Sequence, residues 1–188
     1  MMADLASLAE IAAEREGTKV APWRESFERL LRGEDRAVLA TIFVAESAST
    51  LLGYGKCTLL SRWPDDHPAP RAPVAYGWYL SGLVVRPDHR RQGVGRLLTE
   101  ARLRDLALRD EMAYYFANAT NQVSIALHEK LGFVELTRHF AYPGAWFEGG
   151  VGVLCACDLA PWELSPTDAS ERSPVEEPRL EAEPRSEP

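Results

Sequence analysis

The sequence predicts a mixed α/β (α+β) domain, and three observations support this prediction. Apolar residues repeat at helical spacing near the N-terminus, where Leu5, Leu8 and Ile11 fall on one face of a helix. Short apolar runs bounded by turn residues, such as 37–46 and 51–61, are typical of strands. Hydrophobic residues make up 46% of the 188-residue chain, which is enough to bury one substantial core.

The elements are expected in the order helix, helix, strand, strand, strand, helix, strand, helix, strand, strand. Pro22 can begin the second helix, which carries Trp23, Phe27 and Leu30 on one face. Residues 64–75 contain four prolines and are expected to form a loop. The later elements are a strand over 78–85, a helix over 93–109, a strand over 114–117, a helix over 121–131, and strands near 133–141 and 150–159.

The formal net charge of −7 is unevenly distributed. Residues 165–188 contain seven acidic residues and three arginines, and the rest of the chain contains 21 acidic residues against 18 basic ones. Neither part is basic, so we expect no nucleic-acid partner. There is no apolar run of about 18 residues, and no basic flank precedes an apolar stretch at the N-terminus. We therefore expect no membrane span, no secretory signal and a cytoplasmic location.

One folded domain, residues 1–160, is expected to be followed by a tail. Residues 165–188 contain five prolines and only two large apolar residues, so this acidic segment is predicted to be disordered. The odd number of cysteines argues against a disulfide framework. Cys155 and Cys157 share one face of the last strand and are expected in the core. No recognisable set of zinc ligands is present, and no metal is expected.

The most informative segment is residues 83–98, in which an apolar strand runs through a basic turn into a helix. The first amide groups of a helix have no partner within it, and together with the helix dipole they bind anions. Gly93 and Gly95 leave room for a phosphate to approach the backbone. The alternative is an ordinary strand-to-helix turn with solvated arginines. The turn is not a Walker A loop, because no Gly-Lys-Ser/Thr follows, and it is not a dinucleotide fingerprint, because only two glycines occur where three are needed. The residues expected to be buried on this helix are Val94, Leu97, Leu98 and Ala101.

The hexapeptide RRQGVG at residues 90–95 resembles the Q/R-x-x-G-x-G/A motif of the GCN5-related N-acetyltransferase (GNAT) family. The resemblance implies the GNAT fold: a mixed, mostly antiparallel central sheet flanked by helices, with splayed parallel central strands. It also implies acetyl-CoA as co-substrate. The turn then holds the pyrophosphate, the preceding strand pairs with the pantetheine arm, and the N–H of Leu83 or a neighbour steadies the thioester oxygen. The cofactor-binding residues implied here are Leu83, Val84, Val85, Arg90, Arg91, Gln92, Gly93, Val94, Gly95 and Arg96.

A second stretch, residues 118–133, is similar to the family's second signature, an asparagine before a helix that ends in L-Y-E-K-L-G-F. The resemblance adds Asn118, Asn121 and Ser124 to the cofactor-binding residues. Asn121 can cap the helix and Gly132 can end it, so a plain capping role for Asn121 stays open. The apolar face of this helix is expected to comprise Val123, Leu127 and Leu131.

His128 shares a helix face with Asn121 and Ser124 and stands where the family frequently has a tyrosine. That tyrosine is thought to protonate the departing thiolate, and histidine, with a pKa of about 6.5, can take the same part. The resemblance therefore makes His128 a candidate catalytic acid. The alternative is a half-exposed histidine without a role.

No catalytic base is evident in the sequence. Family members often place a glutamate on the strand before the phosphate turn, but the matching positions here hold Tyr79 and Ser81. Deprotonation through ordered water is one alternative. Glu148, in the loop between the last two strands, is a candidate base because that loop usually borders the acceptor site in the family. It can equally be a solvated turn residue.

The expected reaction is transfer of an acetyl group from acetyl-CoA to a primary amine of a small molecule by direct attack. The alternatives are a protein N-terminal or lysine acetyltransferase, and an acyl-CoA-binding module without catalysis. Homodimers are common in the family, so a homodimer stays open. The family usually begins with a strand before the first helix, and no such pattern precedes the first helix here; either that strand is missing or the true start lies upstream. Aromatic candidates for an acceptor pocket are Trp63, Trp78, Tyr79, Tyr142, Trp146 and Phe147.

Overall fold

Six strands form one mixed sheet in the order β1-β2-β3-β4-β6-β5 in the computed structural model, which describes residues 2–34 and 39–162. Neighbouring strands are antiparallel except β3 and β4, which are parallel. The predicted fold class is therefore confirmed. The predicted tail at 165–188 lies outside the described residues. The strands are β1 (Leu39–Ser47), β2 (Thr50–Leu60), β3 (Gly77–Val85), β4 (Met112–Asn118), β5 (Val134–Thr137) and β6 (Gly152–Asp158).

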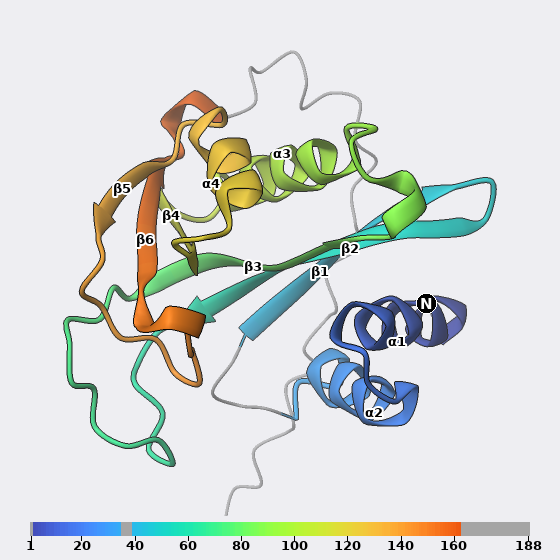
Figure 1. Ribbon diagram of the computed structural model, residues 1–188, viewed down its shortest axis with the longest axis horizontal. Coiled ribbons are helices and arrows are strands. Elements are labelled where there is room, and N and C mark those ends of the chain that lie inside the picture. The colour runs from blue at the N-terminus through green and yellow to red at the C-terminus, as the bar shows by residue number, and fades with distance from the viewer. Residues whose placement is uncertain (1, 35–38, 163–188) are drawn as a thin grey trace, which may run out of the picture.

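Helices cover both faces of this sheet (Figure 1). The pair α1 (Met2–Glu16) and α2 (Val20–Leu31) packs on one face, and α3 (Val94–Leu106) with α4 (Gln122–Glu129) packs on the other. The core beneath α3 and α4 includes all three cysteines, buried and with free thiols, as predicted for Cys155 and Cys157. None of the helices in the described ranges has both the length and the apolar character needed to cross a membrane.

The two central strands pair only near their N-terminal ends. The parallel ladder consists of Trp78 with Ala113 and Tyr79 with Tyr114. Beyond Tyr79 and Tyr114 the ladder stops, and β3 also bulges away from β2 at Gly82, whose φ is +58°. The strands therefore enclose a V-shaped opening. Its closed end lies at the last ladder pair, and its open end lies beside the N-termini of α3 and α4.

Two residues predicted to be buried are exposed. Leu97 is 63% exposed and Val123 is 83% exposed. The buried stripe of α3 instead runs through Val94, Leu98 and Arg102, at spacings of four residues, so Leu97 falls on the solvent side. Val123 lies in the first turn of the short helix α4, whose packed side carries Leu127 and His128 and faces the core.

The fifth strand is shorter than predicted. A strand was expected near 133–141, but β5 ends at Thr137. Beyond it the amide of Ala141 donates a hydrogen bond to the carbonyl oxygen of Pro73, at 2.9 Å. The chain therefore leaves β6 and pairs instead with the proline-rich loop that precedes β3.

Candidate active site

A cleft of about 360 Å³ occupies the opening between β3 and β4. One wall is the C-terminal half of β3, and the other is β4 with the start of α4. Arg15 of α1, Arg102 of α3, and the loop residues Trp146 and Phe147 complete the lining. The predicted site residues that the structure brings together in this cleft are Leu83, Asn118, Asn121, Ser124 and His128.

The remaining part of β3 and the basic turn lie beside a second, smaller hollow. It has a volume of about 100 Å³ and is lined by Val84, Val85, Arg86 and Arg90 together with residues of α1. Val84 is buried against the α1 core, because alternate residues of β3 point to opposite faces of the sheet. Of the predicted strand residues, Leu83 therefore faces the cleft and Val84 does not.

The turn before α3 has the backbone expected of an anion site. Gly93 is the N-cap residue with φ of +86°, and no side chain caps the helix. The first helical hydrogen bond runs from the Leu97 amide to the Gly93 carbonyl, at 3.0 Å. The amides of Val94, Gly95 and Arg96 precede that bond, so the helix itself provides no acceptor for them. Three adjacent donors at the positive end of a helix dipole suit a phosphate.

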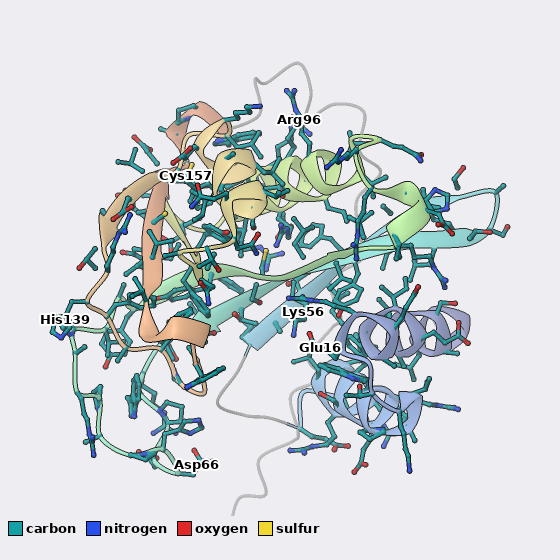
Figure 2. All side chains as sticks on the ribbon, viewed as in Figure 1. Glu16, Lys56, Asp66, Arg96, His139 and Cys157 are labelled. Carbon is teal, nitrogen blue, oxygen red and sulfur yellow. The ribbon has the colours of Figure 1, made fainter. Side chains whose placement is uncertain are left out.

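The polar side chains of this turn serve different purposes. Arg90 Nε donates to the Val85 carbonyl at 3.1 Å, and Gln92 Nε2 donates to the Asp88 carbonyl at 2.8 Å. These two bonds fasten the turn. Arg96 is paired with Glu100 at 2.6 Å and points away from the sheet (Figure 2). Arg91 is exposed in the left-handed region, with φ of +60°.

Gly95 faces the gap between α3, α4 and β3. A Cβ added there lies 3.7 Å from Leu127 and 3.8 Å from Leu83, which is ordinary van der Waals contact. Packing therefore does not require glycine at position 95, whereas Gly93 is needed for its backbone conformation.

The start of α4 combines helix capping with a hydroxyl pair that faces the cleft. Asn121 Oδ1 accepts a hydrogen bond from the Ser124 amide at 3.3 Å, which confirms that Asn121 can cap the helix. Tyr115 Oη donates to Ser124 Oγ at 2.7 Å, and burial raises the pKa of Tyr115 to about 12. The Ser124 hydroxyl accepts this bond, so its own hydrogen is available to a further acceptor.

His128 is buried, with only 2% of its surface exposed. Its ring stacks on Tyr115, with centroids 3.6 Å apart and planes within 6°. Nδ1 lies 2.8 Å from the Ser124 carbonyl oxygen, which can only accept, so Nδ1 carries the proton. Nε2 is buried without a described partner. Burial lowers the pKa of His128 to about 4, although the bond to Ser124 opposes this. The ring is therefore neutral near pH 7.

An aromatic cluster covers the opposite face of the sheet near the closed end of the opening. Tyr79 is fully buried and packs against Phe116 and Tyr142, with centroids 6.0 and 4.7 Å away. Its hydroxyl donates to the Ala75 carbonyl at 2.6 Å, and burial raises its pKa. Ser81 and Tyr142 both lie within hydrogen-bond distance of the Thr58 hydroxyl, at 3.3 and 3.2 Å. Tyr79 and Ser81 are thus bound to other groups and neither is a base.

The other aromatic candidates are divided between core and surface. Trp78 is buried in the core beneath α3, and Trp63 contacts His67 within the proline-rich loop. Trp146 and Phe147 line the cleft, and Trp146 is 81% exposed. The backbone of Glu148 forms the start of a short 3-10 helix, Glu148–Gly150, but its side chain lies outside the described part of the structure.

Arg102 is a site residue that sequence reasoning missed. It is fully buried, and it donates to the carbonyls of Lys56 and Ser81 at 3.2 and 3.4 Å and to Thr99 Oγ1 at 3.0 Å. Burial lowers its pKa to about 10, so it stays charged at neutral pH. It fits against β2 because position 55 is glycine: a Cβ there would lie 2.9 Å from Arg102 Nε. Arg102 therefore ties α3 to both strands at the bulge.

Comparison with curated proteins gives short but significant matches. The chain is 40% identical over 68 residues to a [ribosomal protein bS18]-alanine N-acetyltransferase of Salmonella typhimurium, a match that spans 35% of this chain and 46% of that protein. The chain thus covers less than half of that relative. The ribosomal-protein-alanine N-acetyltransferase of Brucella melitensis has a similar fold, with a TM-score of 0.62 and 20% identity over 84% of this chain and 96% of that one.

Two further comparisons, with a solved structure and with a family model, identify the family. The paia N-acetyltransferase of Thermoplasma acidophilum, solved in complex with coenzyme A, has a TM-score of 0.52 and 17% identity over 82% of this chain and 92% of that one. A family model described as the acetyltransferase (GNAT) family matches residues 6–133, which is more than half of the chain. The chain therefore belongs to the GNAT acetyltransferase family.

Proposed function

We propose that the chain transfers the acetyl group of acetyl-CoA to the α-amine at the N-terminus of a protein or peptide. The observation that carries the proposal is the chemistry of the cleft lining. Its described side chains include two arginines, amides, hydroxyls and aromatic rings, but no carboxylate. A cleft whose described side chains include no strong base favours an acceptor amine of which a substantial fraction is already neutral.

The ordinary pKa values of amines decide which acceptor meets this condition. An α-amine has a pKa of about 7.7–8.0, so about a third of it is neutral at pH 7.5. An alkyl amine such as the lysine side chain has a pKa of about 10.4, and only about one molecule in a thousand is neutral. Arg15 and Arg102 lower the pKa of a bound amine further, because like charges disfavour the ammonium form.

In this proposal acetyl-CoA enters the V-shaped opening from its open end. The diphosphate lies against the amides at the N-terminus of α3, and the pantetheine arm follows β3, with Asn118, Asn121 and Ser124 on the opposite wall. The arm points toward the closed end, where Tyr79 pairs with Tyr114, and its thioester lies at the bulge. Leu83 sits in the bulge and has no ladder partner on β2, which supports a role for its N–H as donor to the thioester oxygen.

The proton for the departing thiolate is assigned to the hydroxyl pair of Tyr115 and Ser124. His128, the candidate acid from the sequence, has a neutral ring whose single proton is held by the Ser124 carbonyl. It is better suited to position Tyr115, on which it stacks, and Ser124. Ser124 can pass its hydroxyl proton to the sulfur and take one from Tyr115, and the proton that the acceptor nitrogen loses restores the phenol of Tyr115.

Relatives support an α-amine acceptor. The matched protein from Salmonella typhimurium is named for acetylation of an alanine of ribosomal protein bS18. The Brucella melitensis protein of similar fold is named as a ribosomal-protein-alanine N-acetyltransferase.

The proposal is tested by measuring CoA release with unblocked peptides, the same peptides with formylated N-termini, and simple alkyl amines. We expect kcat/KM for unblocked peptides to exceed that for alkyl amines by about 100-fold, following the neutral fractions, and blocked peptides to be inert. A preference for alkyl amines would refute the α-amine proposal. Glu148→Gln tests the candidate base separately, and unchanged kcat would exclude that role.

A small-molecule amine is the second candidate acceptor. The aromatic cluster of Tyr79, Phe116 and Tyr142 lies near the closed end of the opening, and an acceptor bound against it would have to be compact. Equal turnover of peptides and of free amino acids or their amides would favour this candidate over the peptide acceptor.

A further inference from the structure

We infer that the acceptor carries a carboxylate close to its reactive amine, and that Lys56, assisted by Arg15, binds this carboxylate. The inference rests on the proposed function for the position of the amine. It goes further by naming a chemical feature of the substrate and the side chains that select it.

Lys56 lies beside the point where the amine must attack. It is on β2 opposite Ser81, and its side chain crosses the bulge of β3. A Cβ added at Gly82 would lie 2.6 Å from Lys56 Cε and 3.5 Å from Nζ. Gly82 lines the cleft, so the ammonium lies beside a residue of the cleft wall, although Lys56 itself is not part of the lining. The absence of a side chain at position 82 is what allows this crossing.

Arg15 approaches the same region from the end of α1. It lines the cleft. Burial lowers the pKa of the Lys56 ammonium, and the charge of Arg15 lowers it further. Figure 2 shows Lys56 between the strands and the end of α1. Arg15 itself pairs with Glu16 at 3.3 Å, but both side chains are about half exposed. Such a pair is weak and leaves the guanidinium able to bind a second anion.

No ion pair joins Lys56 to a carboxylate among the described side chains, and the cleft lining described there contains no acid. A half-buried ammonium beside a second cation is unfavourable unless an anion accompanies it. The neighbouring Thr58 and Ser81, and Tyr142 within hydrogen-bond distance of Thr58, offer hydroxyls but no charge. An acceptor carboxylate would supply the missing negative charge.

The same charges exclude other acceptors. Polyamines and polycationic amines would bring a second positive charge to Lys56 and Arg15, without a described carboxylate in the cleft to receive it. A carboxylate within the first two residues of a peptide, or on a free amino acid, can reach Lys56 while the amine lies at the thioester. The shared chemistry is an amine with a nearby carboxylate, and the test separates its sources.

The experiment measures kcat/KM for three kinds of amine, each as a matched acid and amide. The constants are expressed per neutral amine, because a nearby carboxylate raises the pKa of an amine. The peptides are amidated tetrapeptides that begin with alanine and have glutamate or glutamine as their second residue. The free amino acid pair is alanine and alaninamide, and the alkyl amine pair is 4-aminobutanoate and 4-aminobutanamide. The kind of amine that reacts tests the proposed function. The ratio of kcat/KM for the acid to kcat/KM for the amide, within the kind that reacts, tests the inference about the carboxylate. The two can therefore fail separately.

We expect the wild-type protein to prefer the acid by about tenfold or more, as for a charge-assisted hydrogen bond. Lys56→Met keeps the length of the side chain over Gly82, and should reduce this preference to less than about threefold, while KM for acetyl-CoA stays unchanged. Lys130→Met, an exposed lysine at the far end of α4, is the matched control and should retain the full preference. Thermal melting verifies that each variant is folded.

Several results would overturn the inference. Equal kcat/KM for acid and amide in the wild type excludes carboxylate recognition. A preference that survives Lys56→Met assigns it to other residues. If none of the six amines is acetylated by a protein that binds CoA, both the inference and the proposed function fail. If Lys56→Met does not fold, Arg15→Met is measured instead. An undiminished preference for the acid in that variant would overturn the assignment of the carboxylate to Lys56 and Arg15.

Discussion

Replacement of His128 by phenylalanine tests the neutral, buried ring directly. Phenylalanine keeps a flat ring that can stack on Tyr115, but it cannot take up a proton. In the wild type, burial holds the pKa of His128 at about 4, against about 6.5 in the unfolded chain. The folded state therefore resists protonation. Its contribution to stability is present in full above pH 6.5 and is lost as the pH falls toward 4.

The size of this effect follows from the two pKa values. At pH 5 the unfolded ring is almost fully protonated, whereas the folded ring binds about a tenth of a proton. Between pH 7.5 and pH 5, the free energy of unfolding of the wild type should therefore fall by about 2 kcal/mol through this residue alone. His128→Phe should lack this component. Other titrating groups are common to both proteins and cancel in the comparison.

Urea unfolding at pH 7.5 and pH 5 measures the difference. We expect the wild type to lose about 2 kcal/mol more than His128→Phe. Equal losses in the two proteins would refute the claim that His128 is held neutral by the fold. Activity is measured on the same two proteins without urea. A kcat that changes between pH 6 and 8 in the wild type but not in His128→Phe would identify His128 as the acid that protonates the thiolate.

Three further substitutions test the phosphate turn and the buried arginine. Gly93→Ala places a Cβ on a backbone with φ of +86°, at a cost of about 1–2 kcal/mol, and should weaken CoA binding by roughly tenfold in calorimetry; unchanged affinity would show that the turn does not bind the cofactor. Gly95→Ala should alter the affinity less than about twofold, because its Cβ meets neighbours at normal distance; a large loss would mean that this position contacts the phosphate. Arg102→Met removes charged donors from the carbonyls of Lys56 and Ser81 and should destabilise the fold by about 3 kcal/mol in urea unfolding; a change below about 1 kcal/mol would show that the bonds are dispensable.

The sequence predicted the parts of the site that depend on local chemistry. A strand, a glycine turn and an uncapped helix start follow from the residues around Gly93, and Asn121 was expected to cap α4. These features need only a few neighbouring residues, so they can be recognised without knowledge of the fold. The order of helices and strands was predicted for the same reason.

The parts that could not be predicted depend on contacts between distant segments. Arg102 looks like a solvent-facing residue of an amphipathic helix until the glycine at position 55 and the bulge of β3 are brought beside it. Lys56 and Gly82 are 26 positions apart in the sequence, and nothing local indicates that one side chain crosses the other. The histidine at 128 was expected to titrate near neutrality, and only its burial against Tyr115 changes that expectation.

The tie that Arg102 makes between α3 and the two strands has a consequence for how a cofactor is admitted. Because one guanidinium satisfies the carbonyl groups of both Lys56 and Ser81, the backbone at the bulge of β3 is fixed by bonds within the protein itself. A ligand that binds along this part of β3 then loses little of its affinity to ordering the strand.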